Sequence, residues 1–202
     1  MASRDAGMSA RRARVTRKTL ETALEVELSL DGAGQAEVAT GIGFLDHMLG
    51  ALAKHARFDL TLRCRGDLEI DDHHTVEDCA LALGQALDQA LGERRGIARF
   101  GSAYAPLDEA LARAVVDLSG RPCAVIELDL ERATLGALAC ENLSHFFASL
   151  ATAGRMALHV DVLRGANDHH RAEAAFKAAA LALRQAVRVE GPDQVPSTKG
   201  VL

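Results

Sequence analysis

The chain has 202 residues, about half of them apolar, and a formal net charge of −5. This length suits one ordinary domain or two half-sized ones with a sizeable core, and the mixed charge offers no basic surface for nucleic acid. No stretch is as long and apolar as a membrane span. Without a C-x-x-C pair, the cysteines predict buried, reduced thiols of a cytoplasmic protein: Cys64, Cys79, Cys123 and Cys140.

The first half predicts three strands, a helix, a strand and a second helix. Residues 1–13 are rich in arginine, resemble no signal peptide, and are expected to form a flexible tail. Strict alternation of apolar residues from Leu24 to Leu30 indicates a half-buried strand, and Phe44 begins a run of apolar residues at helical spacing. The expected elements are strands at 14–20, 24–30 and 35–39, a helix at 44–55, a strand at 58–64 and a helix at 74–91.

In the second half the order strand–strand–helix–strand–helix appears again, with strands at 112–118 and 123–130, a helix at 141–154, a strand at 157–163 and a helix at 169–188. His73 follows His47 by 26 residues, and His169 follows His145 by 24, which indicates an internal duplication with one shortened loop. We therefore predict an α/β (α+β) fold of two β-β-α-β-α halves, each a sheet with helices packed on one face. The halves span 14–93 and 94–190 within one compact domain, and 191–202 form a substrate-binding tail.

Two copies of one short pattern carry the candidate chemistry: an acid, two adjacent histidines, and a glutamate four residues after the first histidine. Residues four apart on a helix share a face, so His73 with Glu77, and His169 with Glu173, can each hold one metal ion. Nitrogen and oxygen ligands without thiolate favour Mn, Zn, Fe or Ni, and an octahedral ion such as Mn(II) fits a site with open positions.

The other histidines of the repeat complete this candidate site. His74 and His170 project about 100° away from their neighbours around a helix, so each is expected to serve a second ion nearby. His47 and His145 occupy matching positions in the shorter helix of each half. The predicted set gives two ions four protein ligands each: His47, His73, His74, Glu77, His145, His169, His170 and Glu173.

Asp72 and Asp168, which open the two copies, allow two interpretations. They could orient a metal-binding histidine, or they could cap the N-termini of their helices, which is the simpler interpretation.

A second group of residues is cationic or hydroxylic, and any single member is most simply a solvated side chain. From spacing alone these residues do not assemble into a phosphate site: Arg99, Arg121, Lys177, Ser197 and Lys199.

With these residues in view, the sequence resembles the imidazoleglycerol-phosphate dehydratase family of histidine biosynthesis from about Arg14 to Leu202. Seven motifs occur in the family's order: Arg17-x-Thr19-x-Glu21-Thr22, Gly43-Phe44-Leu45-Asp46-His47-Met48-Leu49, Asp72-His73-His74-Thr75-Val76-Glu77-Asp78, Arg95-Gly96-Ile97-x-Arg99-Phe100-Gly101, Asp117-Leu118-Ser119-Gly120-Arg121-Pro122, Asn167-Asp168-His169-His170-x-x-Glu173, and Pro196-Ser197-Thr198-Lys199-Gly200. The resemblance implies removal of water from imidazole glycerol phosphate to give imidazole acetol phosphate.

The resemblance also implies a cofactor, an assembly and residue roles. Two Mn(II) ions would sit in each active site, between subunits of a trimer, with eight trimers forming a 24-subunit shell. The metals would stabilise an imidazolate form of the substrate, so that its hydroxyl leaves through a diazafulvene-like intermediate. Glu21 falls on the family's acid/base, and the phosphate would be held by Arg99, Arg121, Lys177 and Lys199, with Ser197.

One departure and two rival functions accompany this interpretation. Many relatives place a glutamine near the phosphate where this chain has Gly50-Ala51, so one phosphate contact is expected to be lost or replaced by water.

The predicted histidine and glutamate ligands would also suit a dinuclear metallohydrolase acting on a small phosphorylated substrate. They would also suit a metal-storage or metal-dependent structural shell. Product analysis and substitution of Glu21 separate these alternatives.

Overall fold

The computed structural model describes residues 11–202, and the part of the predicted tail at 1–10 lies outside them. The first half contains β1 (Arg12–Lys18), β2 (Thr22–Ser29), β3 (Ala36–Ala39), α1 (Gly43–Ala56), β4 (Asp59–Gly66) and α2 (His73–Leu91). The second half contains β5 (Phe100–Leu107), β6 (Ala110–Asp117), β7 (Cys123–Glu127), β8 (Thr134–Leu135), β9 (Leu138–Ala139), α3 (Cys140–Ala153), β10 (Ala157–Arg164) and α4 (Asp168–Ala186).

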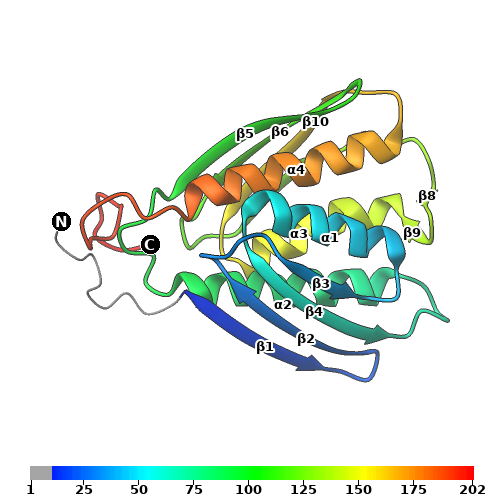
Figure 1. Ribbon diagram of the computed structural model, residues 1–202, viewed down its shortest axis with the longest axis horizontal. Coiled ribbons are helices and arrows are strands. Elements are labelled where there is room, and N and C mark those ends of the chain that lie inside the picture. The colour runs from blue at the N-terminus through cyan, green and yellow to red at the C-terminus, as the bar shows by residue number, and fades with distance from the viewer. Residues whose placement is uncertain (1–10) are drawn as a thin grey trace.

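The two halves have the same topology. One sheet has the strand order β1-β2-β4-β3 and the other β5-β6-β10-β7, while β8 and β9 form a separate hairpin. In both sheets the first pairs are antiparallel and the last pair is parallel. Figure 1 shows the sheets as two outer layers with the four helices between them. The predicted duplicated α/β fold, with helices on one face of each sheet, is confirmed.

All four helices begin at the same end of the molecule. Parallel strands need a crossover connection, and α1 and α3 supply it between β3 and β4 and between β7 and β10. Each helix therefore starts where a strand has just ended, on the right in Figure 1. The doubled histidines follow β4 and β10, so the fold gathers both copies of the pattern at this end.

The core lies between the sheets and is shared by both halves. The alternation predicted on β2 buries Leu24, Val26 and Leu28. Helices of different halves pack together, α1 with α4 and α2 with α3. Phe147 of α3 lies 4.6 Å from Phe176 of α4, measured between ring centroids. Because the central helix layer is common to both halves, neither sheet has an independent core.

Three sequence predictions about the fold were wrong. Arg12 and Ala13, predicted to lie in the flexible tail, instead begin β1 and pair with β2. Strand β5 was missed because its inward positions carry small residues in place of large apolar ones, with Gly101 among them. A Cβ at Gly101 would overlap the carbonyl of Ala182, so glycine is needed for α4 to pack this closely on β5. The cysteines are free, as predicted, but Cys123 is exposed and Cys64 only partly buried. Among the described residues, no helix is long and apolar enough to cross a membrane.

Candidate metal centre

Six of the eight predicted ligands form two triads, each with two histidines and one glutamate. The α2–α3 triad consists of His73, Glu77 and His145, and the α1–α4 triad consists of His47, His169 and Glu173. Within each triad one ligand atom per residue lies within 4.8 Å of the others. Each triad takes its doubled-histidine helix from one half and its single histidine from the other. The two candidate metal sites thus depend on packing between the halves.

The α2–α3 triad is held in place by a buried amide. His145 Nε2 lies 3.0 Å from Glu77 Oε1, and the rings of His73 and His145 stack with centroids 4.7 Å apart. His73 Nδ1 lies 3.0 Å from Asn142 Oδ1, and Asn142 is only 3% exposed. An acceptor at Nδ1 places the proton there and leaves Nε2 free as a ligand. Asn142 is a positioning residue that the sequence analysis missed.

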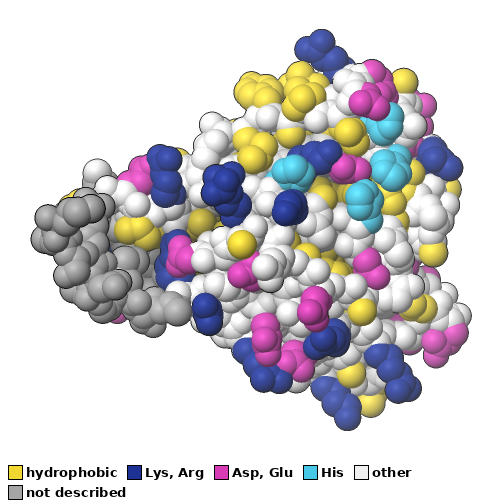
Figure 2. Space-filling model, viewed as in Figure 1, with side chains coloured by type: hydrophobic (Ala, Val, Ile, Leu, Met, Phe, Trp, Pro, Cys, Tyr) yellow, Lys and Arg dark blue, Asp and Glu magenta, His cyan; other side chains and the backbone are white. Residues whose placement is uncertain are grey.

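The α1–α4 triad has the same ligands in different surroundings. His47 Nε2 lies 3.0 Å from Glu173 Oε2, and His169 Nε2 lies 3.4 Å from the same oxygen. The other oxygen of Glu173 lies 2.7 Å from Lys177 Nζ. Burial opposes ionisation of Glu173, but the bonds from Lys177 and His47 outweigh it and lower the pKa of this carboxyl. Figure 2 shows histidine side chains gathered on this face, with cationic side chains beside them.

The triads fit a divalent ion by their chemistry. Imidazole nitrogen and carboxylate oxygen suit Mn, Zn or Fe, and both glutamates are within hydrogen-bond distance of a histidine of their triad. Three protein ligands leave coordination positions open for other groups. The four-residue spacing predicted for α4 is seen directly between His169 and Glu173.

His74 and His170 point away from the triads of their own chain. His74 Nδ1 lies 3.0 Å from Asp67 Oδ2, and His170 Nδ1 lies 2.7 Å from Glu109 Oε2. These hydrogen bonds raise the pKa of both histidines. The bond with His170, aided by backbone N–H groups, lowers the pKa of Glu109 to about 2. Both histidine side chains are partly exposed.

The side chains of Asp72 and Asp168 do not cap their helices, contrary to the simpler interpretation, although Asp72 occupies the N-cap position of α2. The Asp72 carboxylate accepts a hydrogen bond from the Ala139 N–H, and Asp168 accepts bonds from two N–H groups at 131 and 132. The capping role belongs to Asp71 and Asn167, whose side chains accept from the N–H of the first histidine of each pair. The two aspartates instead fasten the starts of α2 and α4 to the segment that leads into α3.

Glu21 lies in the turn between β1 and β2, at the same end of the molecule. Its Oε1 is 3.7 Å from His74 Nε2. The following residue, Thr22, donates its hydroxyl to the buried carboxylate of Asp78, which also accepts a 2.8 Å bond from Arg17 Nε. Asp78, which lies on α2, therefore anchors the β1–β2 turn, in which Glu21 lies. Asp78 has no acidic counterpart in the second half, where Ala174 occupies the matching position.

Most of the predicted phosphate-binding residues lie at the other end of the molecule. The Arg99 N–H donates to the carbonyl of Ala186, the last residue of α4, while its guanidinium binds Asp117 and the Pro196 carbonyl. Ala186 follows His169 by seventeen residues along the helix, which is about 26 Å. Arg121, Ser197 and Lys199 lie on the segments around Arg99. Only Lys177 lies beside a triad.

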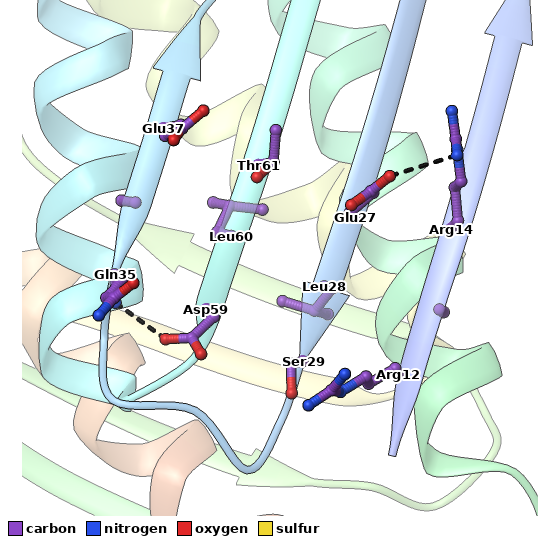
Figure 3. Close-up of a pocket in the computed structure, with 12 residues that line it drawn as sticks. Arg12, Arg14, Glu27, Leu28, Ser29, Gln35, Glu37, Asp59, Leu60 and Thr61 are labelled. Carbon is purple, nitrogen blue, oxygen red and sulfur yellow. Dashed lines mark hydrogen bonds and ion pairs between the residues drawn. The ribbon is translucent and has the colours of Figure 1, made fainter. Parts of the chain in front are cut away.

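A further hollow lies on the outer face of the first sheet, away from all the candidate residues. Figure 3 shows its lining of strand side chains, including Glu27 with Arg14 and Asp59 with Gln35. Charged and polar groups here are already paired across the strands. The hollow contains no repeated motif residue, so the candidate chemistry remains at the helix starts.

Comparisons with known proteins identify the relatives of this chain. The family model described as imidazoleglycerol-phosphate dehydratase matches residues 40–183. A protein of that name from Saccharomyces cerevisiae is 53% identical, over 96% of this chain and 100% of the relative. Another from Phytophthora nicotianae is 63% identical over 95% of this chain, which spans 42% of that longer relative.

Solved structures show the same similarity. The crystal structure of imidazoleglycerol-phosphate dehydratase from Pyrococcus furiosus, in complex with (S)-C348, has a TM-score of 0.81 and 38% identity, over 93% of this chain and 100% of that one. The enzyme of that name from Staphylococcus aureus has a TM-score of 0.79 and 34% identity, over 88% of this chain and 100% of that one. Sequence and fold therefore agree.

Proposed function

The chain belongs to the imidazoleglycerol-phosphate dehydratase family, hydro-lyases of histidine biosynthesis, and from this we propose a two-metal dehydration mechanism. The substrate is imidazole glycerol phosphate and the products are imidazole acetol phosphate and water. The observation that carries the proposal is the pair of matched triads, each with two imidazoles and one carboxylate. Such ligands suit catalytic ions that keep open positions.

Each triad is proposed to hold one Mn(II) ion. When bound, the ions would supply positive charge that stabilises the substrate's imidazole ring as it loses a proton. Because His74 and His170 do not reach the triads of their own chain, we propose that each completes a triad on a neighbouring copy. The ligand number then rises to four for each ion, as the sequence analysis predicted.

Glu21 is proposed as the acid/base that moves a proton on the substrate. Two observations support this role. Its carboxylate lies beside His74, and the turn that carries it is fixed by the buried Asp78. A carboxylate held near a metal ligand can exchange a proton with a substrate bound in the open positions of the ion.

The phosphate is proposed to bind Arg99, Arg121, Lys177, Ser197 and Lys199. Apart from Lys177, these residues lie about a helix length from the triads of the same chain. A small phosphorylated imidazole cannot span that distance. The active site is therefore proposed to combine residues of several copies, which supports a homo-oligomer built from trimers and a 24-subunit particle.

The test is turnover of imidazole glycerol phosphate by the purified protein, before chelation, after chelation and after Mn(II) is added back. We expect activity to be lost with the metal and to return with it, and the product to be a ketone phosphate. Release of inorganic phosphate instead would favour the metallohydrolase alternative.

Glu21→Gln separates the enzyme from a metal-storage or structural shell. The change is expected to lower kcat by about 10³-fold, within the range for a lost acid/base, while metal content and particle size stay the same. Glu25→Gln is the matched control, because Glu25 lies on β2 and is paired with Arg14 on the sheet surface. Normal activity in Glu21→Gln would show that the assigned role is wrong.

The assembly is tested by light scattering with and without chelator. If ligands from neighbouring copies share each ion, removing the metal should shift the particle mass towards trimers. An unchanged large particle after complete chelation would contradict the shared site.

A further inference from the structure

We propose that Asp67 and Glu109 are positioning residues for the two outward histidines. Each holds Nδ1 of its histidine, so that Nε2 faces a metal ion held by a neighbouring copy. This inference rests on the proposed function, since it concerns the ligands that complete the triads. It assigns a role to two carboxylates that lie outside the repeated metal-binding pattern.

The contact in the second half is the more rigid. Glu109 Oε2 lies 2.7 Å from His170 Nδ1, while Glu109 Oε1 accepts bonds from the N–H groups of Ala166 and Asn167. Both oxygens are therefore used, and the carboxylate cannot rotate away without losing bonds to the loop before α4. The nearest carboxylate to His170 Nε2 is Asp108, at 3.8 Å, which is beyond hydrogen-bond distance.

The contact in the first half is equivalent in chemistry. Asp67 Oδ2 and Oδ1 lie 3.0 Å and 3.3 Å from His74 Nδ1. Glu21 lies 3.7 Å from His74 Nε2, again too far for a hydrogen bond. In both halves, then, a carboxylate occupies Nδ1 and leaves Nε2 free. A carboxylate–histidine–metal arrangement fixes the ring and increases the basicity of the ligating nitrogen.

The two carboxylates occupy different positions in the repeat. Asp67 directly follows β4, and its counterpart after β10 is Gly165. Gly165 has a φ of 145°, and a Cβ there would lie 2.8 Å from the Ala110 Cβ and 2.9 Å from the Arg171 Cγ. No acid fits at this position, so the second half supplies Glu109 from the turn between β5 and β6. The two halves thus make the same carboxylate–Nδ1 contact with residues at different repeat positions, which indicates that these histidines need the contact.

The experiment titrates metal-free protein with Mn(II) and follows free Mn(II) by electron paramagnetic resonance. Asp67→Asn and Glu109→Gln remove the charge but keep the shape, and in the second variant the amide oxygen can still accept from the two loop N–H groups. We expect two ions per wild-type chain. Each single variant should bind one of them about 10–100-fold more weakly and the other with unchanged affinity, and the double variant should weaken both.

Matched controls are Glu69→Gln, on the same loop as Asp67, and Glu131→Gln, an exposed acid near α4. Both should bind two ions as the wild type does. Urea unfolding of the metal-free variants separates positioning from a purely structural role, because a purely structural role predicts a lower midpoint with unchanged Mn(II) affinity, whereas positioning predicts weaker Mn(II) binding by the folded protein. If the wild type binds two ions and both variants retain its affinity, the positioning role is wrong. If the wild type binds no Mn(II), the proposed function fails and the positioning role with it.

Discussion

The two triads have identical ligands but different neighbours. At one repeat position the α2–α3 triad has Asn142, whose oxygen holds His73, whereas the α1–α4 triad has Phe44 with its ring edge against His169. At another position the α1–α4 triad has Lys177 paired with Glu173, whereas Leu81 stands at the corresponding place in α2. The three residue types of the triad are the same in both places, whereas the surrounding positions differ.

The turns that begin the two sheets differ in a similar way. The β1–β2 turn is anchored to α2 by the buried Asp78, which has no acidic counterpart in the second half. The β5–β6 turn carries its own anchor, Glu109, which binds the loop before α4. Each half therefore fixes a turn beside an outward histidine. In the first half a helix residue, Asp78, binds the turn, and in the second half a turn residue, Glu109, binds the loop before the helix.

The largest expected effects come from breaking one triad at a time. His145→Ala and His47→Ala each remove one of three ligands, so each variant should lose one of the two ions. Turnover should fall by more than about 100-fold, beyond what the loss of a positioning contact gives. Metal analysis measures the ion content and activity assays measure the turnover. His159→Ala is the control, because His159 lies on β10 and does not belong to the repeated ligand pattern. If either variant bound as many ions as the wild type, the triad assignment would be wrong.

The next effect tests Asp78, the anchoring residue of α2 that has no acidic counterpart in α4. Asp78→Ala removes the acceptor for Arg17 and Thr22, and the free energy of unfolding should fall by about 2 kcal/mol. This is less than for a fully buried pair, because the Arg17 side chain is 36% exposed. Urea denaturation measures the change. A midpoint equal to that of the wild type would mean that the turn is held by other contacts.

A smaller effect should follow from making the two triads alike. Lys177→Leu gives the α1–α4 triad the residue found at the matching position of α2. Removing an ammonium 2.7 Å from Glu173 should strengthen Mn(II) binding there by up to about tenfold, while the KM for the phosphorylated substrate rises. Metal titration and steady-state kinetics give the two readouts. Unchanged metal affinity would show that Lys177 does not compete with the ion.

The smallest effect concerns the start of β4, where Asp59 stands at the repeat position that Ala157 occupies at the start of β10. The Asp59 carboxylate accepts bonds from the N–H groups of Gln35, Ala33 and Gly34, and these lower its pKa (Figure 3). This stabilisation is complete above the unfolded pKa of about 3.9 and is lost as pH falls through the lower folded value. Asp59→Asn should reduce the urea midpoint of the metal-free protein by about 0.5 M at pH 7. A difference from the wild type that did not shrink as the pH fell below about 3.9 would contradict this origin.

The ligand pattern and the duplication could be predicted from sequence because both depend on local spacing. Residues four apart on a helix share a face in any fold, so the pairing of His169 with Glu173 followed directly. The pairing of α1 with α4, and of α2 with α3, depends on contacts between the halves and was not predictable from spacing. Strand β5 was missed because glycine and alanine fill its inward positions, which weakens the apolar alternation.

The positioning residues were missed for a different reason. Comparing the repeats favours residues that occur at the same place twice, and this excluded Asp78. Asn142 and Phe44 share a position but differ in chemistry, and Asp67 corresponds to a glycine. The support around a duplicated site is therefore visible only in three dimensions.

Cross-half pairing of the helices has a consequence for the origin of the chain. A polypeptide of half the length would carry one single-histidine helix and one doubled-histidine helix, which in the present fold never share a triad. Such an ancestor could bind metal only as a two-fold symmetric dimer, with two identical centres formed between its copies. Gene fusion would have preserved both triads and placed all three residues of each within one chain. It would also have allowed one centre to acquire a lysine and the other an asparagine.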